Sequence, residues 1–156
     1  MKLLQKNTRN SPEIIVDTNI IFSAILYPHG NERILFNIAE NSNVPMIILD
    51  YVEDELKAIF LRKGMTYDIV VDFLDTYHNI TFKEIGEITN EEAGLANKLV
   101  SDVKDRPLFV WVYRCIQNGI NCNLITGDKE LHKAIVKNAL KGHVYVAKEY
   151  IKVIST

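Results

Sequence analysis

Short apolar runs alternate along the chain with longer segments in which apolar residues recur at helical spacing. The runs, rich in β-branched residues, predict strands at 13–16, 46–49, 80–82, 123–126 and 143–146. The periodic segments predict helices at 19–26, 32–39, 52–61, 67–77, 107–119 and 129–140, and a capping box at Thr89 and Glu92 opens another that runs towards Val100. Short apolar strands separated by helices favour a parallel sheet that is covered on both faces. The pattern therefore predicts an α/β fold, a three-layer α/β/α sandwich around a central, mostly parallel sheet of about five strands.

Size and composition predict a single domain spanning residues 1–156, with its core at about 13–146. The chain has 156 residues, 47% of them hydrophobic and 24% charged, which is usual for one globular domain. No window approaches the ~20 consecutive apolar residues of a membrane helix, and the first residues lack the apolar run of a signal peptide. We therefore expect a cytoplasmic protein that does not contact a membrane.

Charge and cysteine content narrow the possible chemistry. Eighteen Lys and Arg residues against twenty Asp and Glu residues give a formal net charge of −2, so any binding of nucleic acid must be local. Cys115 and Cys122 belong to no CxxC pair or Cys/His cluster, so we interpret both as packing residues. The four histidines share no ligand spacing, and we assign them no role.

Two acidic residues follow predicted strands at the edge where parallel sheets bind ligands. Asp17 comes directly after the first strand, and Asp128 follows the strand at 123–126. If these two strands are neighbours in the sheet, both carboxylates meet at one pocket. Taken singly, Asp17, Asp105 and Asp128 also suit a simpler role, because each precedes a predicted helix that an aspartate can cap.

The sequence around these acidic residues resembles that of a PIN domain over roughly residues 13–146. The matching segments, in chain order, are Val16-Asp17-Thr18-Asn19, Glu55-Leu56, Asp102-Val103-Lys104-Asp105-Arg106-Pro107 and Leu124-Ile125-Thr126-Gly127-Asp128-Lys129-Glu130-Leu131. The D-T-N and T-G-D-K segments are the most specific, and the Glu55 match is the loosest. The resemblance implies an α/β/α sandwich with a pocket of metal-binding carboxylates.

By this resemblance, the metal ligands and catalytic residues are Asp17, Glu55, Asp105 and Asp128. Asn19 and Thr126 would lie beside them and orient carboxylates or water, and Asp102 would be a fifth, outer acid. Two assignments stay open, because Asp102 competes with Asp105 for one place and Glu53 competes with Glu55.

A pocket of carboxylates predicts hard divalent cations and hydrolytic chemistry. The ligands are all oxygen donors, so Mg²⁺ or Mn²⁺ is expected, as one ion or two. Such ions activate water and stabilise the charge that develops on phosphorus during phosphodiester hydrolysis. Arg106 and Lys129 are the nearest candidates in sequence for contacting substrate. More distant candidates are Arg33, Arg62, Lys63 and Arg114. Trp111 and Tyr113 are the aromatic candidates for stacking on a base.

These features predict a metal-dependent endoribonuclease, with RNA as the substrate class implied by the resemblance alone. A solitary domain of this length resembles the toxin component of a toxin–antitoxin pair, which implies an antitoxin partner and a homodimer. Alternatives are an RNA-processing nuclease of the same build and a catalytically inactive PIN-like scaffold that binds RNA or protein. A third alternative is a phosphoryl-transfer or receiver-like domain in which Asp17 is the nucleophile.

Overall fold

The computed structural model describes residues 11–156 and contains a five-stranded parallel sheet with the strand order β3-β2-β1-β4-β5. The strands are β1 (Glu13–Val16), β2 (Met46–Leu49), β3 (Ile80–Lys83), β4 (Cys122–Ile125) and β5 (Val144–Tyr145). The central strand β1 pairs with both β2 and β4, and Ile15 lies opposite Ile47 and Leu124. Every residue of β2 and β4 is buried, because helices cover both faces of the sheet.

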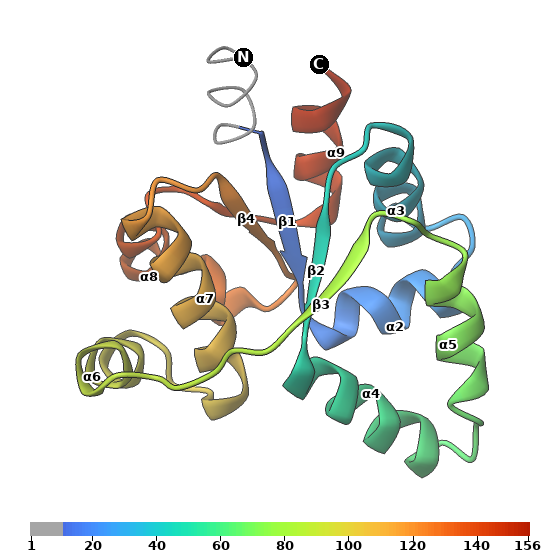
Figure 1. The fold of residues 1–156 in the computed structure, drawn as a ribbon, viewed down its shortest axis with the longest axis horizontal. Helices are drawn as coiled ribbons and strands as arrows, with labels where there is room; N and C mark the ends of the chain where they lie inside the picture. Colours follow the sequence, from blue (N-terminus) through green and yellow to red (C-terminus); the bar gives the residue numbers. More distant parts are fainter. Residues whose placement is uncertain (1–10) are drawn as a thin grey trace.

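Within residues 11–156, eight α-helices form the two outer layers, and Figure 1 shows α6, α7 and α8 on the opposite side of the sheet from α2, α3, α4 and α5. The predicted three-layer α/β/α sandwich is therefore confirmed. The helices are α2 (Thr18–Leu26), α3 (Asn31–Asn41), α4 (Asp50–Arg62), α5 (Asp68–Asp75), α6 (Asn90–Leu99), α7 (Arg106–Gln117), α8 (Ala134–Ala139) and α9 (Ala147–Ser155). Two 3-10 turns, η1 (Val103–Asp105) and η2 (Lys129–His132), precede α7 and α8.

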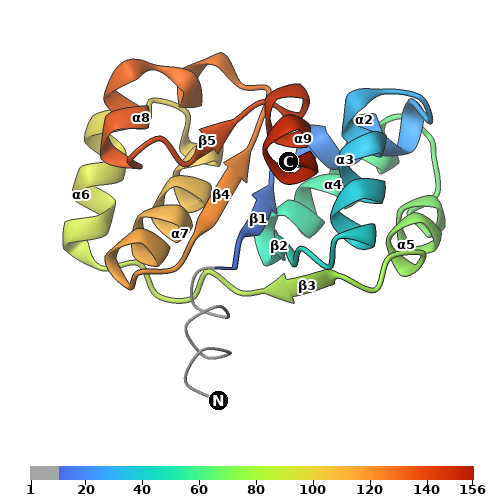
Figure 2. The same ribbon diagram turned by 90° about the horizontal axis from the view of Figure 1, so that it is seen from above.

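Two helical segments differ from the prediction. The helix expected at 129–140 is divided into η2 and α8, because Lys133 between them has an extended backbone (φ −60°, ψ 146°). Helix α9 was not predicted at all. It packs beside α3, as Figure 2 shows, and its Tyr150 is buried. By contrast, the predicted end of α7 is confirmed, since Gly119 follows it with the positive φ of +71° that glycine adopts readily.

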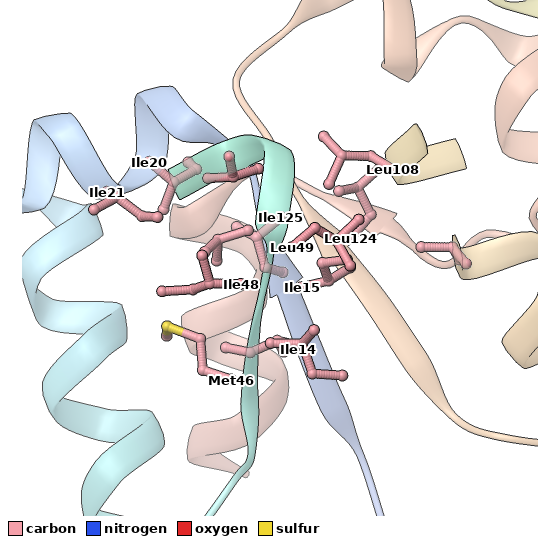
Figure 3. Packing of buried hydrophobic residues seen from close by; sticks show 14 of the residues in the cluster. Ile14, Ile15, Ile20, Ile21, Met46, Ile48, Leu49, Leu108, Leu124 and Ile125 are labelled. Carbon is pink, nitrogen blue, oxygen red and sulfur yellow. The ribbon is translucent and has the colours of Figure 1, made fainter. Parts of the chain in front are cut away.

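The core lies on both sides of the sheet and fixes the strand ends that carry the acidic residues. Figure 3 shows Ile20 and Ile21 of α2 on one side of β1 and Leu108 of α7 on the other. Fully burying one such side chain contributes roughly 1.5–3 kcal/mol, so the central strands form a rigid base. None of the helices within residues 11–156 is long and apolar enough to cross a membrane.

Candidate functional site

A cavity of about 600 Å³ lies at the carboxyl ends of β1 and β4. The two strands are hydrogen-bonded neighbours, as the prediction that Asp17 and Asp128 meet required. All four predicted ligands line this cavity, together with Asn19 and Asp102. The complete lining is Asp17, Thr18, Asn19, Tyr51, Asp54, Glu55, Ala58, Ile59, Arg62, Asp102, Lys104, Asp105, Leu108 and Asp128.

Asp17 is held in place through both of its carboxylate oxygens. Its Oδ1 accepts a hydrogen bond from the backbone N–H of Ile20 (2.9 Å) and so caps α2. Its Oδ2 accepts a hydrogen bond from the hydroxyl of Thr126, a residue with no exposed surface. Burial of the carboxyl raises the pKa of Asp17 above its ordinary value, and these hydrogen bonds partly offset that effect.

Thr126 connects the two strand ends through its hydroxyl. Its Oγ1, which donates to Asp17, also accepts a hydrogen bond from the backbone N–H of Asp128 (3.0 Å). The carboxylate of Asp128 in turn accepts a bond from the N–H of Glu130 (3.0 Å), which caps η2. One buried hydroxyl therefore fixes the relative positions of two acidic residues.

Asp105 is a buried acidic residue whose side chain has no evident role in stabilising the fold. It is only 8% exposed, and its Oδ2 is buried without a hydrogen-bond partner among residues 11–156. The residue has a helical backbone (φ −88°, ψ −13°) at the start of α7, and its side chain makes no capping bond. The capping role considered for Asp105 is therefore not observed. A buried acceptor without a partner is costly, which makes Asp105 a candidate ligand of a metal ion at this site.

Asp105 shares its corner of the cavity with Asp128 and Asp102. One carboxylate oxygen from each of the three lies within 4.8 Å of the others. Burial, and then the neighbouring Asp128, raise the pKa of Asp105 to about 8. The neighbouring Asp105 in turn lowers the pKa of the Asp128 carboxyl. Without a cation, the pair keeps its proton to relieve the repulsion between its charges.

The structure bears on both pairs of acids between which the sequence left the choice open. Asp102 and Asp105 both line the cavity, but Asp105 is buried whereas Asp102 is exposed and caps η1 through a bond from the N–H of Lys104 (3.0 Å). Of the two glutamates on α4, Glu55 lines the cavity and Glu53 is outside its lining. The Oε2 of Glu55 accepts a hydrogen bond from the hydroxyl of Thr18 (3.2 Å), which holds it beside β1.

The basic side chains that line the cavity are not the two that were predicted from their positions next to the acidic motifs. Arg106 donates through Nε to the carbonyl of Val100 (2.9 Å) and through Nη2 to that of Ser101, so it braces the preceding loop. Lys129 is exposed and outside the lining. Arg62, named only among the distant candidates, and Lys104 line the cavity instead.

Three other candidate contacts have structural partners away from the cavity. Arg114 pairs with Glu92 (2.5 Å between Nε and Oε2), and Arg33 donates to the carbonyl of Ala24 (2.6 Å). The ring of Tyr113 stacks on Phe109 within α7, so it packs against the core.

Sequence reasoning also missed Thr18 and Tyr51. Thr18 lies inside the D-T-N segment and positions Glu55, although its side chain is not itself charged. Tyr51 lines the cavity among the carboxylates, and burial followed by the charges of Glu55 and Asp17 raises the pKa of its hydroxyl. A helical signal was available, because Tyr51, Glu55 and Arg62 recur on one face of α4.

The donor set fits a hard divalent cation. The lining contains six acidic side chains, Asp17, Asp54, Glu55, Asp102, Asp105 and Asp128, against two basic ones, Arg62 and Lys104. The side-chain donors are oxygens, which suit Mg²⁺ or Mn²⁺, and the buried Asp105 oxygen provides an acceptor that nothing else in the described chain uses.

The chain matches no family model and no curated protein sequence. It is similar in structure to PAE2754 from Pyrobaculum aerophilum, with a TM-score of 0.60 and 14% sequence identity. The match covers 94% of this chain and 92% of that one. At this identity the likeness supports the α/β/α fold and carries no information on activity.

Proposed function

We propose that the protein is a metal-dependent endoribonuclease that uses Mg²⁺ or Mn²⁺ to hydrolyse RNA phosphodiester bonds. The observation that carries the proposal is the buried Oδ2 of Asp105, which lacks a partner among residues 11–156 in a cavity that Asp17, Glu55 and Asp128 also line. These are the four acids that the resemblance to PIN domains assigns to metal binding. RNA as the substrate comes from that resemblance.

The protein's own contribution is to hold these carboxylates in fixed positions. Thr126 orients Asp17, and Thr18 orients Glu55, in each case through a donated hydrogen bond. Such outer contacts keep ligands preorganised. A divalent cation bound there would activate water and stabilise the charge that develops on the phosphorus.

The charge of the cavity also requires cations before an RNA backbone can enter. With six acidic side chains against Arg62 and Lys104, the carboxylates alone would repel phosphate. Divalent ions would reverse that balance locally, and the two basic side chains would then contact phosphate oxygens of the bound strand. A net charge of −2 for the whole chain is compatible with such local attraction.

The biological setting we propose is that of a toxin in a toxin–antitoxin pair, acting in the cytoplasm as a homodimer and inhibited by a protein antitoxin. The resemblance to PIN domains is what suggests this setting. Growth arrest on expression, relieved by the product of an adjacent gene, would support it. Normal growth during expression of an active nuclease would favour the RNA-processing alternative instead.

The inactive scaffold and the phosphoryl-transfer enzyme fit the site less well. A scaffold has no need of four converging acids, one of them with a buried, unpartnered oxygen. An aspartyl-phosphate at Asp17 would have to form on a carboxylate that is only 6% exposed and accepts hydrogen bonds through both oxygens.

The test is cleavage of a mixed-sequence RNA by purified protein with Mn²⁺, Mg²⁺ or EDTA. Asp17→Asn and Glu55→Gln are expected to lower the rate by roughly 10²–10³-fold. Glu53→Gln is the matched control, since Glu53 is on the same helix but outside the cavity lining, and it should cleave at the wild-type rate. Cleavage that persists in EDTA or in folded Asp17→Asn would contradict the proposal. So would wild type that is inactive on several RNAs with either metal.

A further inference from the structure

A second cluster of metal-ligating side chains lies at the opposite edge of the sheet, where β1 and β4 begin. Glu13 is the first residue of β1 and is paired in register with Cys122, the first residue of β4. Cys115 comes from α7, which packs against β4. This cluster is separate from the acidic cavity, whose residues follow the other ends of the same strands.

The three side chains are close enough to share one ion. One ligand atom from each lies within 4.8 Å of the other two, and the Sγ of Cys115 is 4.0 Å from an Oε1 of Glu13. Both cysteines are buried and free, whereas Glu13 is half-buried.

Trp111 supplies a second, independent observation at this cluster. It precedes Cys115 by one helical turn, and its indole N–H is buried without a hydrogen-bond partner among residues 11–156. This donor lies beside the sulfur of Cys122. Nitrogen donors directed at sulfur ligands are a common outer shell of metal–thiolate sites, where they stabilise the thiolate.

We propose that Glu13, Cys115 and Cys122 bind a thiophilic divalent cation such as Zn²⁺. Two thiolates and a carboxylate are ligands that Zn²⁺ accepts in tetrahedral sites, and water reaching the Glu13 side would complete the fourth position. Binding releases the two thiol protons to solvent. Mg²⁺ and Mn²⁺ prefer oxygen ligands, so the two sites would select different metals.

An ion at this position would join the elements that carry the acidic cavity. β1 leads to Asp17, β4 leads to Asp128, and α7 begins next to Asp105. The cation would therefore fix these three elements to one another at their far ends. It would stabilise the fold without contacting substrate.

The test is a titration of reduced, metal-free full-length protein with Cd²⁺, followed by the near-ultraviolet charge-transfer absorbance of cadmium–thiolate bonds. Wild type should show this band at saturation, and Cys115→Ala and Cys122→Ala should lose it. Glu13→Gln should keep the band but bind roughly 10-fold or more weakly. Asp17→Asn, altered only at the acidic cavity, should titrate like wild type, which separates this site from the proposed nuclease site.

Zinc provides a second measurement that does not depend on the cysteine variants being stable. Zn²⁺ should raise the melting temperature of wild type and of Asp17→Asn, and raise that of Glu13→Gln much less at the same concentration. Wild type without the charge-transfer band would overturn the proposal. So would folded Cys122→Ala or Glu13→Gln that binds Cd²⁺ as tightly as wild type.

Discussion

Replacing Thr126 with valine tests how the acidic cavity is held together. Valine has nearly the same shape as threonine, so this fully buried position keeps its packing and loses only the hydroxyl. That hydroxyl donates to Asp17 and accepts from the N–H of Asp128. The backbone bond from the N–H of Thr126 to the carbonyl of Tyr145 should remain, because it does not involve the side chain.

The expected cost follows from the two bonds that are lost. A hydrogen bond to a charged group contributes about 1.5–3 kcal/mol, and a buried N–H left without an acceptor costs about 1–3 kcal/mol. Asp128 is partly exposed, so water recovers some of the second contribution. We expect Thr126→Val to lower the free energy of unfolding by about 2–4 kcal/mol. Because Asp17 then loses its orientation, Mn²⁺ affinity should fall by roughly 10–100-fold.

Urea unfolding in EDTA measures the stability change, and calorimetric titration with Mn²⁺ measures the affinity. Thr126→Ser is the matched control, because it keeps the hydroxyl and removes one buried methyl group, at about 1 kcal/mol. Serine should therefore lose some stability and retain near wild-type affinity for Mn²⁺. Folded Thr126→Val that binds Mn²⁺ as tightly as wild type would refute the idea that the hydroxyl positions a metal ligand.

Three further predictions concern other parts of the chain. Arg62→Met should weaken RNA binding by roughly 10-fold or more, measured by fluorescence anisotropy with Mn²⁺, while Mn²⁺ affinity is unchanged; an unaffected RNA affinity would exclude Arg62 from the substrate path. Asp105→Asn should abolish the rise in melting temperature that Mn²⁺ causes and leave stability in EDTA equal or higher, because asparagine removes a carboxyl that must take up a proton when it is buried; a marked loss of stability in EDTA would contradict this. Arg114 holds the pKa of Glu92 at about 2, against an ordinary 4.5. The stability that this pair adds is thus complete above pH 4.5 and is lost as the pH falls towards 2. In urea unfolding, Glu92→Gln should therefore lower the free energy of unfolding by about 1–2 kcal/mol at pH 6 and by much less near pH 2. An equal loss at both pH values would contradict the assignment.

The sheet was predictable from sequence because its signal is local. Each buried strand is a short apolar run, and the order of strands and helices leaves few ways to cover both faces of a parallel sheet. The convergence of Asp17 and Asp128 followed from the same rule, once β1 and β4 were shown to be neighbours. Strand adjacency itself depends on long-range packing, which no local pattern specifies.

The contacts of the basic residues were less predictable, because neighbours in sequence point in different directions on a helix. Arg106 follows Asp105 directly, yet its guanidinium turns back to the loop carbonyls of Val100 and Ser101. Arg62 is not adjacent to any of the acidic motifs in sequence. It lies two turns beyond Glu55 on the same face of α4. Helical periodicity, and not adjacency to a motif, was the signal that could have identified it.

Capping and metal binding, considered as rival explanations for the aspartates, prove compatible in this fold. Asp17 caps α2 through Oδ1 and keeps Oδ2 on the hydroxyl of Thr126, while Asp128 caps η2 through one oxygen and reaches Asp105 through its side chain. A helix cap uses one or two backbone donors, so the carboxylate keeps further lone pairs for a cation. Observing a cap therefore does not argue against a metal ligand. Asp105 is the residue that distinguishes between capping and metal binding. It caps no helix, and its buried Oδ2 has no hydrogen-bond partner in the described part of the chain. Folding alone therefore does not explain its position at the cavity.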